Sequence, residues 1–289
     1  MPTPGHDGPP AAAPAPRGVA LAAAPAPRGV ALAAIAALIY LVLGAGLMNS
    51  ALFGDDVVSP AAFWAQNGPF PATLRSRVPP GIDLLSDNVT QFTPWLRYAA
   101  DSWARERTIP LWKSLAFCGA PLVGNGQSAL FFPTNLAAVL LGAPAWFGTA
   151  QTLFKLVAGA LGAFALARHL RLSFPAALLA GFVFGFGGFQ VVFLQHPHTL
   201  VSLLLPLLLL CADRLVLAPS AGAVAALALV AGLQHLGGHS ETAVHCQAAA
   251  LALGLARAWS LRRHPGATTG RRLGSLAGAL ALGAVLGAI

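Results

Sequence analysis

Residues 29–48 read GVALAAIAALIYLVLGAGLM, and the uncharged stretch around them extends from Arg28 to Asp55. A helix needs about 20 apolar residues to cross roughly 30 Å of hydrocarbon. Lipid offers backbone amides no hydrogen-bond partner, so a single spanning segment must be helical. The stretch therefore predicts a transmembrane helix. It is also too long for the apolar region of an ordinary signal peptide, so we expect an uncleaved anchor.

Further apolar segments of helical length follow this first one. The chain is 56% hydrophobic, only 9% of its residues are charged and its mean hydropathy is +0.70, which is typical of proteins that cross the membrane several times. We expect an all-α polytopic membrane protein with about seven transmembrane helices. The further spans are predicted at about residues 144–167, 172–194, 199–217, 218–233, 242–258 and 273–289, the last of them truncated at the end of the chain.

Four regions follow from this pattern. Residues 1–28 are rich in Ala, Pro and Gly, and a copy of Pro14–Ala23 recurs at Pro25–Ala34, so we expect a disordered cytoplasmic tail. Residues 29–48 form the first span. Residues 49–143, here called the insert, carry six of the nine acidic residues and predict a large extracytoplasmic loop with interfacial helices. Residues 144–289 hold six further spans.

Arginine placement predicts the orientation of the spans. With the N-terminus in the cytoplasm, the ends of spans two, four and six should carry positive charge, and eight arginines fall there: Arg168, Arg171, Arg214, Arg257, Arg262, Arg263, Arg271 and Arg272. The net charge of +8 is therefore mostly a topology signal, and we expect no nucleic-acid binding. The protein is predicted to be a multi-pass membrane protein with a cytoplasmic N-terminus.

Smaller signals refine the expected helices. Ser173 with Pro175 is typical of a helix start, and Gly237 with Gly238 predicts a turn between spans five and six. The glycine-rich segment 181–188 lacks the strand and lysine of a phosphate loop, so it predicts close helix packing. In the insert, helical spacing predicts an interfacial helix with Pro94 in its first turn and with an apolar face formed by Phe92, Trp95, Leu96, Ala99 and Trp103.

Three stretches of the chain resemble the YfhO family of bacterial membrane proteins. They are SDNVTQFTPWLRY at Ser86–Tyr98, IPLWKSLAFCGAPLVGNGQSALFFPTN at Ile109–Asn135, and Arg171–Leu210 with its His196-Pro197 pair; Gly238-His239 adds to them. That family resembles glycosyltransferases of the GT-C type, which take a sugar from a polyprenyl-phosphate carrier on the outer face. The resemblance covers about residues 30–289 and implies a GT-C-like fold in the N-terminal portion of a longer protein. It also implies a location in the bacterial inner membrane.

The resemblance implies that Asp87 is the catalytic carboxylate of the first outer loop, with Gln91 beside it. In such chemistry a carboxylate takes the proton of an acceptor hydroxyl as the hydroxyl attacks the anomeric carbon. The leaving phosphate needs cations rather than a general acid, and Arg97, Lys113 and Lys155 are the candidates. Asp87 as a helix cap and Lys155 as a snorkelling side chain are the alternative interpretations.

Other candidate site residues carry less specific signals. Asp55 and Asp56 are a secondary acidic pair, which ordinary solvated surface explains equally well. Asn125 and Gln127 are substrate-binding residues by resemblance alone. His196, His198, His239 and Glu241 are predicted at the outer membrane boundary, where they could line the sugar site; a divalent metal ion stays open, although their spacing fits no zinc pattern.

The sequence thus predicts a membrane glycosyltransferase that moves a sugar from a polyprenyl-phosphate donor to a glycan or lipid acceptor of the cell envelope. The first alternative is a transporter or flippase of the lipid-linked sugar that performs no catalysis. The second is a non-catalytic envelope protein whose outer region binds a partner. The expected partners are the lipid-linked donor, membrane lipid and the acceptor.

Overall fold

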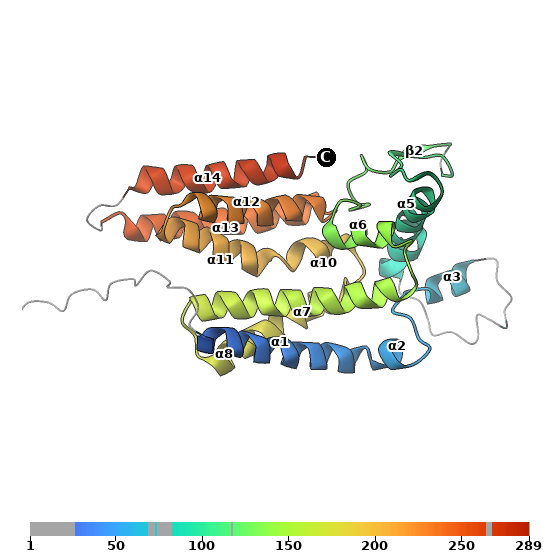
Figure 1. The fold of residues 1–289 in the computed structure, drawn as a ribbon, viewed down its shortest axis with the longest axis horizontal. Helices are drawn as coiled ribbons and strands as arrows, with labels where there is room; N and C mark the ends of the chain where they lie inside the picture. Colours follow the sequence, from blue (N-terminus) through green and yellow to red (C-terminus); the bar gives the residue numbers. More distant parts are fainter. Residues whose placement is uncertain (1–26, 69–72, 74–82, 117, 264–267, 289) are drawn as a thin grey trace, which may run out of the picture.

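The structure, a computed structural model, describes residues 27–68, 73, 83–116, 118–263 and 268–288. The predicted tail at residues 1–28 lies outside this part of the chain, except for Pro27 and Arg28 at the start of the first helix. Two groups of long, roughly parallel helices lie side by side, with α1, α7 and α8 in one group and α11 to α14 in the other (Figure 1). The insert gathers at one end of both groups, here called the insert end.

Helices occupy every segment in which the sequence predicts a span. The third and fourth segments are each divided in two, at Phe186–Gly187 and at Leu203–Leu204. Pro206 lies in the first turn of the helix after the second break, where a missing amide hydrogen is tolerated. The bounds are α1 Pro27–Leu47, α7 Trp146–His169, α8 Phe174–Gly185, α9 Gly188–Val192, α10 Pro197–Ser202, α11 Leu205–Leu217, α12 Ala221–Leu236, α13 Ser240–Leu261 and α14 Thr269–Leu286.

Four of these segments are long and apolar enough to cross a membrane: Gly29–Leu47, Trp146–His169, Phe174–Val192 and Pro197–Leu217. Helix α12 is apolar but shorter. The chain is therefore a mostly helical, membrane-embedded protein, which confirms the coarse part of the predicted fold class.

The insert folds into short elements around a small core of its own. Trp95, Ala99, Leu122, Leu130 and Val139 are buried together, and Pro94 lies in the first turn of α5, as the sequence predicts. The elements are α2 Asn49–Phe53, α3 Ala62–Asn67, η1 Asp83–Leu85, η2 Asn88–Phe92, α5 Thr93–Glu106, β1 Trp112–Lys113, β2 Ala120–Pro121 and α6 Pro133–Leu140. Strands β1 and β2 pair antiparallel, with Trp112 opposite Pro121.

Glycines let α8 approach α7 and α1 closely. A Cβ on Gly185 would lie 2.7 Å from the Leu156 carbonyl oxygen and 2.7 Å from the Ala160 Cβ. Gly181 faces Tyr40 and the Ala160 carbonyl, and the Tyr40 hydroxyl donates to the Leu178 carbonyl at 2.8 Å. These contacts confirm that the glycine-rich segment packs helices rather than cradling a phosphate.

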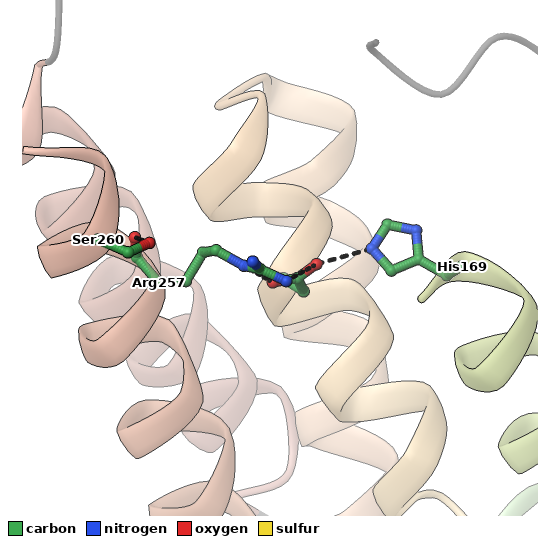
Figure 2. A network of polar contacts seen from close by, with 4 residues as sticks. His169, Arg257 and Ser260 are labelled. Carbon is green, nitrogen blue, oxygen red and sulfur yellow. Dashed lines mark hydrogen bonds and ion pairs between the residues drawn. The ribbon is translucent and has the colours of Figure 1, made fainter. Parts of the chain in front are cut away.

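The opposite end of the helices, here called the arginine end, contains a buried ion network. The Asp213 carboxylate is 1% exposed and accepts hydrogen bonds from Arg257 Nε at 2.6 Å and Nη2 at 3.3 Å. His169 Nε2 lies 2.7 Å from the same carboxylate. Figure 2 shows Arg257 and His169 on opposite sides of α11, the helix that carries Asp213. The network joins α7, α11 and α13, and it satisfies a carboxylate that would otherwise be costly to bury.

Candidate functional site

Asp87 lies at the start of η2, a single π-helical segment that continues into α5. Its side chain is exposed, makes no hydrogen bond to the backbone amides that follow, and accepts from Gln91 Nε2 at 2.9 Å. The cap alternative for Asp87 is therefore wrong. Irregular turns of this kind often occur at functional sites, and here the turn leaves a carboxylate free at the surface with one oriented amide donor.

His196 lies in the connection between α9 and α10 and packs against the η2 turn that follows Asp87. Its ring is 3% exposed and meets Phe92 of η2 edge-on, with centroids 5.4 Å apart, and Phe193 at 5.7 Å. The Asn88 side-chain amide donates to the Gln195 carbonyl at 3.2 Å, which ties η2 to the same connection. These contacts bring the insert against the α9–α10 connection, over a hundred residues away in the sequence.

Lys155 of α7 binds the backbone of this connection. Its ammonium is in the interior, the residue is 4% exposed, and Nζ donates to the Leu194 carbonyl at 2.7 Å and the His196 carbonyl at 3.3 Å. The snorkelling alternative is therefore wrong. Because the ammonium already holds two carbonyls, Lys155 orients the His196 segment rather than presenting a free cation for a phosphate.

A second and a third imidazole complete a group that we call the histidine cluster: His196, His198 and His239. The rings of His198 and His239 lie 3.7 Å apart between centroids. His239 precedes α13, and its Nδ1 accepts from the Thr242 amide at 3.2 Å and meets the Thr242 hydroxyl at 2.8 Å. Since Nδ1 is an acceptor, the proton of neutral His239 is on Nε2.

Several ring nitrogens of the cluster lack partners. Both nitrogens of His196 and Nδ1 of His198 are shielded from solvent and make no hydrogen bond within the described part of the chain. Shielded polar atoms without partners are rare and costly. A ligand or an ordered water that enters the cluster would satisfy them.

Burial and nearby charges set the protonation of the cluster. Burial lowers the pKa of His196; Asp87 opposes that shift and Lys155 adds to it. Burial also lowers the pKa of His239, while Glu241 raises it and His245 lowers it further. Both imidazoles are therefore neutral near pH 7, and each offers one N–H donor rather than a positive charge.

An apolar groove leads to the histidine cluster from the membrane-spanning part of the molecule. It has a volume of about 850 Å³ and lies between α8–α9 on one side and α11 and α13 on the other. Leu179, Val183 and Phe189 are among its apolar walls, and Gln190, Ser202 and Thr242 are its polar groups. Thr242 is the residue that bonds His239, so one end of the groove adjoins the cluster.

The remaining predicted site residues lie around this centre. Glu241 is exposed in the first turn of α13, and its charge acts on His198 and His239. A Cβ on Gly238 would lie 3.1 Å from the Gln127 carbonyl, which places the backbone of Gln127 beside the residue preceding His239. Asn125 instead caps its own turn, since its Oδ1 accepts from the Ser128 amide at 3.1 Å.

Arg97 and Lys113 have partners inside the insert. Arg97 pairs with Asp101 at 3.2 Å on the exposed face of α5, and Lys113 Nζ lies 4.9 Å from the centroid of the Trp95 ring. Trp95 in turn packs against Phe92, the neighbour of His196. Lys113 is therefore two aromatic rings away from the cluster, while the described contacts do not bring Arg97 to it.

Asp55 and Asp56 are exposed in the connection between α2 and α3. The nearby Val58 carbonyl accepts a hydrogen bond from the Gln195 side chain. The acidic pair is thus on a loop that is tied to the residue before His196.

Sequence reasoning missed the residues that join the parts. Asn88, Gln195 and Thr242 make the bonds that hold η2, the α2–α3 connection and α13 to the cluster. Gln190 and Ser202, which bond each other at 3.0 Å, are buried. The available signal was the presence of polar amides and hydroxyls in otherwise apolar segments, which are costly unless paired.

Within the described residues, no group of three or more His, Cys, Asp or Glu side chains is arranged to hold a metal ion. Comparison of the chain with protein-family models, with curated proteins and with solved structures finds no match. The fold and composition therefore define the class of protein, a mostly helical membrane-embedded protein, and the candidate site rests on its own geometry.

Proposed function

We propose that the protein is a membrane glycosyltransferase, similar to the YfhO family and of the GT-C type. It transfers a sugar from a polyprenyl-phosphate donor to an acceptor of the bacterial cell envelope. One observation carries the proposal: the turn that bears the exposed Asp87 carboxylate packs through Phe92 on the histidine cluster, and the other side of the cluster meets an apolar groove of about 850 Å³. In this proposal the N-terminus is cytoplasmic and the insert is extracytoplasmic.

The arrangement suits this chemistry in three ways. The groove accommodates part of an apolar carrier chain within the membrane. His196 and His198, which have unpartnered ring nitrogens, each donate one N–H bond to the donor phosphate. Asp87, oriented by Gln91, takes the proton of the acceptor hydroxyl as that oxygen bonds the anomeric carbon. The carbon–oxygen bond to phosphate breaks in the same displacement, and the phosphate leaves with the electron pair.

The Asp87→Asn variant tests the proposal. General-base catalysis contributes about 10²–10⁴-fold, so we expect transfer from a radiolabelled polyprenyl-phosphate sugar to envelope acceptors in native membranes to fall at least about 100-fold. Asp101→Asn is the matched control, because Asp101 is a partly exposed carboxylate of the same insert, paired with Arg97. Undiminished transfer by folded Asp87→Asn protein would remove Asp87 from catalysis.

A transporter or flippase of the same lipid-linked sugar is the second candidate. The breaks at Phe186–Gly187 and Leu203–Leu204 resemble the discontinuous helices of transporters. The chain between them includes the α9–α10 connection, whose carbonyls bind the buried Lys155. Proteoliposomes loaded with the labelled donor separate the two functions. Turnover supports the transferase, and movement across the bilayer without turnover supports the transporter.

A further inference from the structure

A group of arginines at the arginine end has no carboxylate partner within the described chain. Arg262 and Arg263 follow α13, and Arg271 and Arg272 lie in the first turn of α14. The sequence has no acidic residue after Glu241. Asp213, at the same end, is already bound by two other side chains. Since a helix dipole repels cations from its first turn, the charge of Arg271 and Arg272 is poorly compensated.

Arg272 is the most constrained of the group. Its Nε and Nη1 are shielded from solvent and make no hydrogen bond to the described residues. It lies one turn before Leu276, on the face of α14 that continues through Ala279 and Gly283, all buried. Two guanidinium nitrogens that have lost water without gaining an acceptor are costly. A phosphate is a fitting acceptor, because the planar fork of arginine binds its oxygens in pairs.

An apolar pocket of about 340 Å³ lies between the last turns of α13 and the first turns of α14. It is lined by Leu255, Ala256, Ala258, Trp259, Thr269 and Leu273. Trp259 is 66% exposed, and the Arg262 guanidinium lies 3.5 Å from the centroid of its ring. Tryptophan beside arginine at the end of an apolar helix is typical of the level of lipid headgroups.

We propose that this corner, formed by the end of α13 and the start of α14, binds one anionic phospholipid. Arg271 and Arg272 hold the headgroup phosphate, Arg262 adds charge at its edge, and an acyl chain occupies the pocket beside Trp259. The uncompensated charge selects an anionic over a zwitterionic lipid, and the apolar pocket selects a lipid over free phosphate. The site is remote from the histidine cluster and independent of the proposed transfer.

The test measures lipid binding to the purified full chain in detergent by native mass spectrometry. The probes are phosphatidylglycerol and phosphatidylcholine with identical acyl chains. An arginine near anionic lipid contributes about 1 kcal/mol, so we expect Arg272→Gln to weaken phosphatidylglycerol binding about fivefold. Trp259→Ala should also weaken it. Arg168→Gln, which removes an exposed charge at the same end, should change it less than about twofold.

Three results would overturn the proposal. They are equal affinity for the two lipids, unchanged phosphatidylglycerol binding in both Arg272→Gln and Trp259→Ala, and equally effective displacement by millimolar inorganic phosphate, which would identify a soluble anion as the ligand. Should Arg272→Gln fail to fold, Arg262→Gln replaces it, because Arg262 is exposed. A reduced preference for phosphatidylglycerol in that variant supports the proposal, and an unchanged preference there contradicts it.

Discussion

At the scale of the residue, His196 connects the insert with the long helices at the candidate site. Its ring is 3% exposed, packs on Phe92 of the insert, and lies in a segment whose carbonyls bind Lys155. Any charge placed on the ring would have to be accommodated in an environment with few solvent contacts. Protonation of His196 is therefore coupled to the packing of the insert on the helices.

Stability should fall in acid for this reason. The folded pKa of His196 is lowered from 6.5, chiefly by burial, so below about pH 6.5 the unfolded state binds more protons than the folded state. The free energy of unfolding then decreases as pH falls, by up to about 1.4 kcal/mol per pH unit for one such group. The decrease continues until the folded His196 also titrates, and His239 acts in the same direction.

Thermal unfolding in detergent at pH 7, 6 and 5 measures the effect. We expect the wild-type Tm to decrease with pH and His196→Gln to show a smaller decrease. Val244→Ala is the control, since Val244 is an exposed residue of α13 without a titratable group and its variant should keep the wild-type slope. A His196→Gln slope equal to that of the wild type would contradict this account.

At the scale of the element, α8 is positioned by how closely its backbone meets α7. Small residues permit such contacts in membranes, where packing rather than the hydrophobic effect drives helix association. Gly185 faces the Leu156 carbonyl and the Ala160 Cβ. Helix α8 also forms one wall of the apolar groove, so this packing determines the width of the proposed carrier site.

Gly185→Ala should therefore destabilise the protein. The added Cβ would lie 2.7 Å from both neighbours, and overpacking of this kind costs about 1–3 kcal/mol. The measurement is unfolding by sodium dodecyl sulfate in mixed micelles. Gly46→Ala is the matched control, because a Cβ there meets nothing within 4 Å; it should be neutral or slightly stabilising. Equal stability of the two variants would refute the close-packing argument.

At the scale of the whole molecule, the two ends of the helices differ in chemistry. The insert and the histidine cluster lie at one end, while the arginines and the Asp213 network lie at the other (Figures 1 and 2). This asymmetry favours the proposed orientation, since positively charged short loops stay in the cytoplasm.

Cysteine labelling checks the orientation. Cys118 is an exposed free cysteine of the insert, whereas Cys246 is buried. We expect a membrane-impermeant maleimide to label Cys118 in intact spheroplasts, with Cys118→Ser as the negative control. Arg263→Cys, made in the Cys118→Ser background, should react only after permeabilisation. The opposite pattern would place the insert in the cytoplasm and exclude the proposed reaction with an extracytoplasmic acceptor.

Much of the fold was predictable because membrane helices are specified locally. Span length, apolar composition and arginine position are properties of contiguous residues, and the helices α1 and α7 appear within a few residues of their predictions. The position of the Lys155 ammonium was not predictable, because a lysine within a span can extend to the membrane surface or turn inward. Its two carbonyl partners come from a segment about forty residues away.

The sequence by itself determined that the chain is helical and membrane-embedded. Hydrocarbon offers backbone amides no hydrogen-bond partner, so such apolar segments cross it as helices. It also marked Asp87 and the three histidines as candidates, without showing that they meet. Only the tertiary structure decided that η2, the α9–α10 connection and the start of α13 converge, and that Lys155 is a buried support. The physical reason is that these contacts are long-range polar bonds and ring packings, for which local composition carries no signal.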